Sequence, residues 1–170
     1  MNPEIEYKTW KVVLSGIGKW LCVILFVMFI LSKGKKNFTS PASFEQVSER
    51  VQSVLDFSTM EEADNQMIKR IYHLEPGDYE NILCYYPTTN MDATEFLLIR
   101  FKSQDQAEAA VSAANARIAS QMASFEGYGV TQYAMLEKSV VDASGGYLLY
   151  VTSDNSDAVD RTYAGALRGE

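Results

Sequence analysis

The chain has 170 residues, of which 47% are hydrophobic and 22% charged, and its net charge is -7. This length suits one ordinary domain with an appendage, and the mixture of charged and hydrophobic residues is not that of a disordered protein. Two cysteines and a single histidine argue against a disulfide scaffold and a zinc ribbon.

The charge is divided unequally along the chain. Residues 1–36 hold six lysines and two glutamates, a charge of +4. Residues 37–170 hold nine basic and twenty acidic side chains, a charge of -11. An acidic surface of this kind repels phosphate backbones, so we expect no nucleic-acid partner for this part of the chain.

Residues 12–31 form an apolar run whose only charged side chain is Lys19. As a helix this run is about 30 Å long, the thickness of one hydrocarbon core. We therefore expect residues 1–36 to be a single-pass transmembrane signal-anchor with basic flanks, in contact with the lipid bilayer. The side chains expected to hold it in the membrane are Trp20, Leu21, Phe26, Phe29 and Leu31.

A cleaved secretory signal is the alternative for this segment. Glu4 and Glu6 in its first region, and Lys33 inside the candidate cleavage site, disfavour cleavage. Three lysines lie near the span on each side, so the positive-inside rule does not fix its orientation. Residues 37–43 are expected to be a short tether, followed by a single domain over residues 44–170.

Helix start signals predict three helices in the first part of this domain. Ser43 and Gln46 have the spacing of a capping box and open the first helix. A second is expected over residues 58–74 and a third, the longest, over residues 103–125. The third should bury a face of apolar residues at helical spacing, namely Ala107, Val111, Ala114, Ile118, Met122 and Phe125.

Four β-rich runs predict strands. Residues 82–86 and 95–101 form an expected hairpin, and residues 133–141 and 147–152 form another. The second pair flanks Gly145 and Gly146, and glycine permits the positive φ of a tight turn.

A last helix is expected to begin near Asp154. After the two leading helices, the order of elements is therefore ββαββα. We predict an α+β fold in which four mainly antiparallel strands form a sheet with helices on one face.

The sequence contains no recognisable catalytic constellation. His73 lies at a predicted helix end, where a histidine often caps carbonyls. Cys84 lies in an apolar strand and is interpreted as a buried thiol. The acidic residues near Asp154 have neither the glycine nor the final glutamate of an EF-hand loop. We expect no catalytic residue, no metal ion and no cofactor.

One polar set is a candidate ligand-binding site: Arg117, Gln121, Tyr128 and Gln132. Arg117 and Gln121 are one helical turn apart, and the other two follow the helix end. If the four converge with Glu95 or Glu137, the guanidinium is placed to grip a carboxylate or a peptide carbonyl. The other interpretation is that Arg117 lies over the sheet and pairs with an acidic residue, while Gln121 and Tyr128 hydrogen-bond the following loop.

The spacing of these residues also resembles a known family. Its motifs here are Arg117-x3-Gln121-x3-Phe125-x2-Tyr128-x3-Gln132, Gly146-Tyr147-Leu148-Leu149, Ser153-Asp154, Ile71-Tyr72, an acidic turn over residues 75–78, Tyr86-Pro87 and Glu95. The chain thus resembles, over residues 44–167, the bacterial domain of unknown function family 4358, whose members are small envelope and lipoprotein-like proteins of Gram-positive bacteria. It departs from the family at Thr94, where an acid is usual, and in lacking a lipid-attachment cysteine.

The resemblance implies a location in the cell envelope and supplies no catalytic residue. We expect a domain outside the cytoplasm, anchored in the cell membrane, that acts as a binding or assembly module with an envelope protein or peptide as partner. A membrane-tethered regulatory domain inside the cell is one alternative, and a hydrolase-type enzyme using acidic residues and Arg117 is another. The sequence does not determine the oligomeric state, and self-association through the sheet stays open.

Overall fold

The computed structural model describes residues 39–170. The predicted anchor, including Trp20, Leu21, Phe26, Phe29 and Leu31, lies outside the described residues. No helix within residues 39–170 combines the length and the apolar character that a membrane crossing requires.

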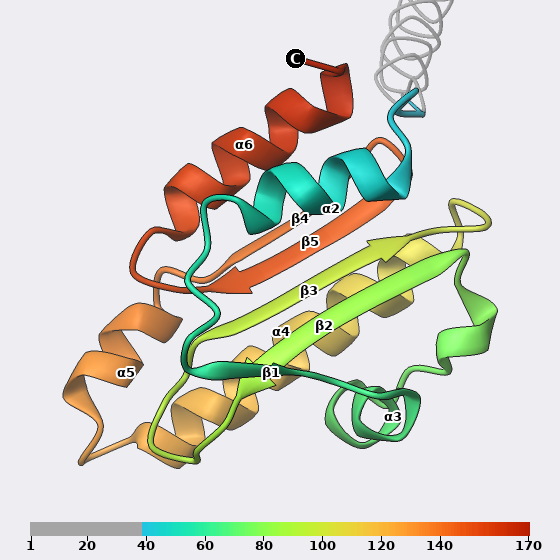
Figure 1. The fold of residues 1–170 in the computed structure, drawn as a ribbon. Helices are drawn as coiled ribbons and strands as arrows, with labels where there is room; N and C mark the ends of the chain where they lie inside the picture. Colours follow the sequence, from blue (N-terminus) through green and yellow to red (C-terminus); the bar gives the residue numbers. More distant parts are fainter. Residues whose placement is uncertain (1–38) are drawn as a thin grey trace, which may run out of the picture. The chain divides into compact units, whose positions relative to one another are not determined.

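A five-stranded antiparallel sheet forms the centre of the domain (Figure 1). The strands lie in the order β1-β2-β3-β5-β4. Their bounds are Met60–Glu62 for β1, Asn81–Pro87 for β2, Glu95–Arg100 for β3, Val140–Ser144 for β4 and Tyr147–Thr152 for β5.

Helices cover both faces of this sheet, so the domain has three layers (Figure 1). On one face α2 and α6 pack against side chains such as Phe96 and Leu149. On the other face α3 and α4 pack against side chains such as Leu97 and Tyr150. The helix bounds are Phe44–Gln52 for α2, Asn65–Tyr72 for α3, Gln106–Phe125 for α4, Val130–Leu136 for α5 and Ser156–Arg168 for α6, with a 3-10 turn, η1, at Pro76–Asp78.

The α+β class is confirmed, but the expectation of four strands with helices on one face is wrong. The central strands β3 and β5 are buried along almost their whole length rather than at alternate positions. A strand that is apolar on both sides needs cover on both sides, which the second pair of helices supplies.

The fifth strand comes from the start of the predicted second helix. Glu61 and Glu62 pair with Tyr86 and Tyr85 of β2, so this segment is extended. The helix α3 begins only after Asp64, whose carboxylate accepts a bond of 2.7 Å from the backbone N–H of Met67. An N-cap of this kind satisfies a backbone N–H that has no partner within the first turn of the helix. The helix therefore begins after Asp64 rather than at Ser58.

The predicted strand over residues 133–141 is also wrong in its first half. Residues Val130–Leu136 form the short helix α5, and β4 begins only at Val140. Leu136 packs with Phe125 and Ala93 in a small separate core. This contact with the end of α4 stabilises a helix where the local pattern favoured a strand.

Other local predictions are confirmed. Ser43 and Gln46 form the capping box of α2. Gly145 and Gly146 both have positive φ in the turn between β4 and β5. The last helix begins at Ser156, two residues after the predicted start.

Part of the predicted tether is packed on the domain. The Ser40 backbone N–H donates to the carbonyl of Gly145 at 2.8 Å, and its hydroxyl donates to that of Leu167 at 2.7 Å. The Tyr147 hydroxyl bonds the Ala42 carbonyl at 2.8 Å. Residues 40–42 are therefore held between the β4–β5 turn and the end of α6.

Candidate functional site

Glu95, the first residue of β3, is a wholly buried carboxylate. Alternate residues of a strand share one face, so Glu95 lies on the same face as Leu97 and Ile99, beneath α3 and α4. Burial of an ionised carboxylate is very costly unless the group is paired and hydrogen-bonded. The residues around Glu95 supply both an opposite charge and hydrogen-bond donors.

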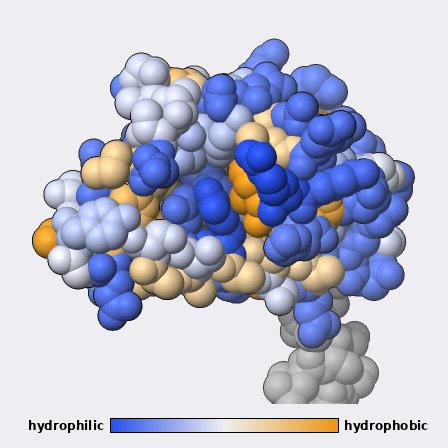
Figure 2. Space-filling model, turned by 90° about the horizontal axis from the view of Figure 1, so that it is seen from below, coloured by the Kyte–Doolittle hydropathy of each residue, from blue (hydrophilic) through white to orange (hydrophobic). Residues whose placement is uncertain are grey.

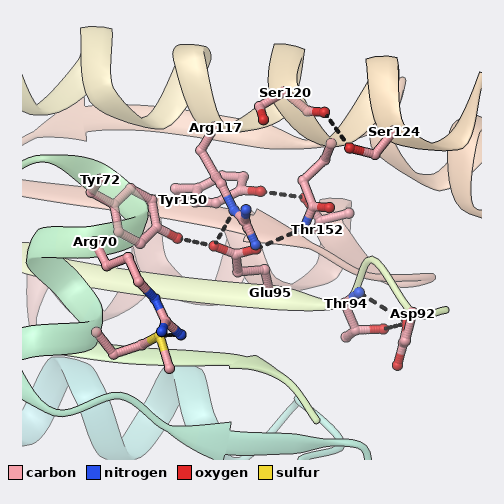
Figure 3. Close-up of polar contacts among 12 residues, drawn as sticks. Arg70, Tyr72, Asp92, Thr94, Glu95, Arg117, Ser120, Ser124, Tyr150 and Thr152 are labelled. Atoms are coloured by element: carbon pink, nitrogen blue, oxygen red, sulfur yellow. Dashed lines mark hydrogen bonds and ion pairs between the residues drawn. The ribbon is translucent and has the colours of Figure 1, made fainter. Parts of the chain in front are cut away.

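Three side chains from the covering helices bond this carboxylate (Figure 3). Arg117 reaches it with Nη2 at 2.8 Å from Oε2 and with Nε at 3.0 and 2.9 Å from its two oxygens. Gln121 donates from Nε2 at 3.1 Å, and the hydroxyl of Tyr72 donates to Oε1. We call these four residues the Glu95 cluster.

The orientation of α4 explains why Arg117 and Gln121 reach the sheet. The residues of α4 that are buried on the sheet are Ala110, Ala114 and Gln121, and Arg117 lies on the same stripe at helical spacing. The predicted apolar face is rotated from this one, with Val111 and Ile118 only half-buried. The small alanines allow the helix to approach the sheet, so longer polar side chains reach Glu95.

The electrostatics of the cluster favour a charged pair surrounded by neutral groups. Burial lowers the pKa of Arg117, but the hydrogen bonds and the charge of Glu95 outweigh burial and leave it raised. Burial, and then the charge of Glu95, raise the pKa values of the Tyr72 and Tyr150 hydroxyls and of the Cys84 thiol. These groups stay protonated at neutral pH, so Cys84 is not a nucleophile.

This arrangement makes the cluster a structural ion pair. The acceptors of Glu95 are occupied by Arg117, Gln121 and Tyr72, and the carboxylate has no exposed surface. A general base must reach the proton that it removes, and Glu95 is closed off from solvent. Arg117, whose side chain is 20% exposed, is the most exposed residue of the cluster and connects it to the outside.

A groove between α3 and α4 opens above the cluster. It has a volume of about 430 Å³. Figure 2 views the molecule from below and shows a hollow in this face with strongly hydrophilic and apolar side chains side by side. We call it the α3–α4 groove; its lining residues are Met67, Arg70, Ile71, Tyr72, His73, Tyr86, Ala113, Ala116, Arg117 and Ser120.

The structure divides the four residues predicted as a ligand site. It brings Arg117 and Gln121 together at Glu95. Tyr128 is 63% exposed and lies with Glu137 at a second hollow beside α5. Gln132 bonds the carbonyl of Met91 at 2.9 Å. The four side chains therefore do not converge on one pocket.

The sequence pointed to Arg117 but missed Arg70 and Tyr72 as its neighbours. Arg70 and Tyr72 lie on α3, whose position against α4 is a tertiary contact. The Ile71-Tyr72 motif at a predicted helix end is the one feature of the sequence that pointed to Tyr72. His73, with φ of 55° at the end of α3, lies at the rim of the α3–α4 groove.

Two further positions singled out in the sequence lie outside the Glu95 cluster. Thr94 donates from its backbone N–H and its hydroxyl to Asp92, at 3.0 and 2.8 Å (Figure 3). Its departure from the family pattern therefore does not alter the bonds of Glu95. Asp154 is exposed. Within residues 39–170, no three His, Cys, Asp or Glu side chains are grouped to hold a metal ion.

These observations define a three-layer α+β domain with a buried ion-pair cluster beneath a basic groove. Residues 53–153 match the model of the family described as Domain of unknown function (DUF4358), and the chain belongs to this family. The matched residues include the Glu95 cluster and all of the α3–α4 groove. No curated protein and no solved structure shows significant similarity to the chain.

Proposed function

We propose that the protein is a binding or assembly module of the bacterial cell envelope, anchored in the membrane by residues 1–36, with its domain outside the cytoplasm. The apolar run of residues 12–31 supports the anchor, because it has the length of a membrane span. The resemblance to small envelope proteins supports the location. The partner is an envelope protein or peptide.

The observation that carries the binding role is the α3–α4 groove. Binding sites are concave and combine apolar side chains with a few placed polar groups. The groove combines the side chains of Met67 and Ile71 with those of Arg70 and Arg117. Its floor is fixed, because Arg117 is held by a buried carboxylate. A preformed surface of this kind loses little conformational entropy when a ligand binds.

A catalytic role has less support than a binding role. The carboxylate nearest Arg117 is Glu95, whose oxygens are already bonded and buried. Cys84 is buried, and its pKa is raised. A regulatory domain tethered inside the cell would use the same groove, so the side of the membrane decides between the two binding hypotheses.

Labelling of a surface cysteine in intact cells tests the location. Ser112 is exposed on α4 and does not line the groove. The chain has two cysteines, the buried Cys84 and Cys22 in the apolar run. Ser112→Cys in a Cys22→Ser background therefore places one accessible thiol on the domain. A membrane-impermeant maleimide is expected to label intact cells as strongly as lysed cells. Labelling that appears only after lysis would place the domain in the cytoplasm and contradict the proposal.

Crosslinking from native membranes tests the binding surface. A photoreactive residue at Ser120, in the groove, is expected to capture an envelope partner of the full-length chain. The same residue at Ser112, on the same helix but outside the groove, is the matched control. Equal capture at both positions, or capture at Ser112 alone, contradicts the groove as the binding surface.

A further inference from the structure

We infer that the α3–α4 groove binds a carboxylate that carries an apolar substituent, and that Arg70 is the residue that binds the carboxylate. This inference rests on the proposed function, in which the groove is the binding surface. It adds the chemical class of the ligand.

The charge of the groove differs in sign from that of the domain as a whole. Residues 37–170 contain twenty acidic and nine basic side chains. The residues that line the groove include two arginines and the histidine, and none of the acidic residues. The domain as a whole is acidic, whereas the side chains that line the groove are positive or neutral, so the groove favours an anion.

Arg70 is the second arginine of the groove. Its Nη2 contacts the thioether sulfur of Met67 at 2.7 Å, and sulfur is a weak acceptor. Within residues 39–170, no carboxylate lies at ion-pair distance from Arg70. Figure 3 shows Arg70 extending from α3 and Arg117 from α4. The planar guanidinium of Arg70 is therefore available to bind a carboxylate through two parallel bonds.

The net charge at the groove distinguishes a carboxylate from a phosphate. Arg117 shares its charge with Glu95, which accepts three of its N–H···O contacts. The two arginines that line the groove and the buried Glu95 together leave one net positive charge, with His73 counted as neutral as in the formal net charge. One positive charge matches a singly charged carboxylate better than a phosphate monoester, which carries about -1.5 to -2.

The apolar side chains of the groove indicate the remaining part of the ligand. Beside the arginines, the groove presents Met67, Ile71, Ala113 and Ala116. Its volume of about 430 Å³ lies within the range of small-molecule sites. An apolar substituent next to the carboxylate would cover these side chains. A peptide that ends in a hydrophobic residue has this combination of groups.

Binding of three matched probes to the full-length chain in detergent tests the ligand class. N-acetylphenylalanine carries the carboxylate, N-acetylphenylalaninamide is its neutral counterpart, and phenyl phosphate carries the dianion. Ligand-observed NMR is expected to show binding of the carboxylate, with the amide weaker by about tenfold or more because one charge-assisted pair is lost. Equal binding of acid and amide, or stronger binding of the phosphate, overturns the inference.

Three variants test the role of Arg70. Arg70→Gln is expected to weaken binding of N-acetylphenylalanine about tenfold or more, and Arg70→Lys to restore part of it, since lysine keeps the charge but not the fork. Arg50→Gln is the control with the same charge change, because Arg50 is exposed on α2, which covers the opposite face of the sheet. An equal loss in Arg50→Gln, or no loss in Arg70→Gln, overturns the assignment.

The outcome separates this inference from the proposed function. If no probe binds while crosslinking from Ser120 still captures a partner, the carboxylate is wrong and the groove is still a binding surface. If Ser120 captures nothing but the carboxylate binds through Arg70, the ligand class stands and the envelope-partner proposal fails.

Discussion

Arg117 and Glu95 join α4 to β3 through an ion pair in which both the Nε and the Nη2 of the guanidinium contact the buried carboxylate. The pair lies between α4 and the sheet, at the first residue of β3. It links the stability of the domain to the floor of the α3–α4 groove, because the same arginine takes part in both.

Removal of one partner of this pair should destabilise the fold strongly. Arg117→Met leaves Glu95 buried without its cation, and losses of this kind are about 3–5 kcal/mol. The free energy of unfolding of the full-length chain, followed by near-ultraviolet circular dichroism in denaturant, measures the effect. The double variant Glu95→Leu/Arg117→Met should recover most of the loss, because it buries no unpaired charge. A single variant as stable as the parent chain would show that the pair does not stabilise the fold.

The buried tyrosines should make the domain sensitive to alkali. Burial raises the pKa values of Tyr72 and Tyr150 above the value of about 10 that they have in the unfolded chain. Above that pH the unfolded state binds fewer protons than the folded state, so the free energy of unfolding falls as pH rises. The stability is fully present below about pH 10 and is lost progressively toward the folded pKa values.

Absorbance of tyrosinate and denaturant unfolding between about pH 9 and 12, the range around the ordinary tyrosine pKa, measure this loss of stability. Tyr150→Phe should reduce the slope of the free energy of unfolding against pH by up to about 1.4 kcal/mol per pH unit. Tyr128→Phe is the control, because its ring is exposed. An unchanged slope in Tyr150→Phe would contradict the prediction.

Cys84 should be inert in the folded protein. The thiol is buried, and burial followed by the charge of Glu95 raises its pKa, which suppresses the reactive thiolate. In a Cys22→Ser background, an aromatic disulfide reagent should modify Cys84 only in denaturant. Fast modification under native conditions would show that this layer of the domain opens readily.

Gly129 should be required at the junction of α4 and α5. A Cβ atom at this position would meet the ring of Phe125, which is buried in the small core with Leu136. Gly129→Ala is expected to cost about 1–3 kcal/mol, the usual range for overpacking. Gly77→Ala is the matched control, since nothing lies within 4 Å of its added Cβ. Similar melting temperatures for the two variants would contradict the close approach.

The local parts of the fold were predictable because they depend on neighbouring residues. Ser43 and Gln46 bond one another across a single helical turn, and Gly145 and Gly146 set their own turn. The segments that were misassigned depend on distant partners. Glu61 and Glu62 are extended because β2 lies beside them, and α5 is helical where Leu136 packs on Phe125.

The same difference between local and tertiary information applies to the candidate site. The sequence by itself determined that Arg117 and Gln121 lie one turn apart on a helix, since helical spacing is a local property. Only the tertiary structure decided that they face a buried Glu95, that Tyr128 and Gln132 lie elsewhere, and that Arg70 shares a groove with Arg117. The rotation of α4 against the sheet follows from close packing of side chains from several strands, and no local pattern contains that information.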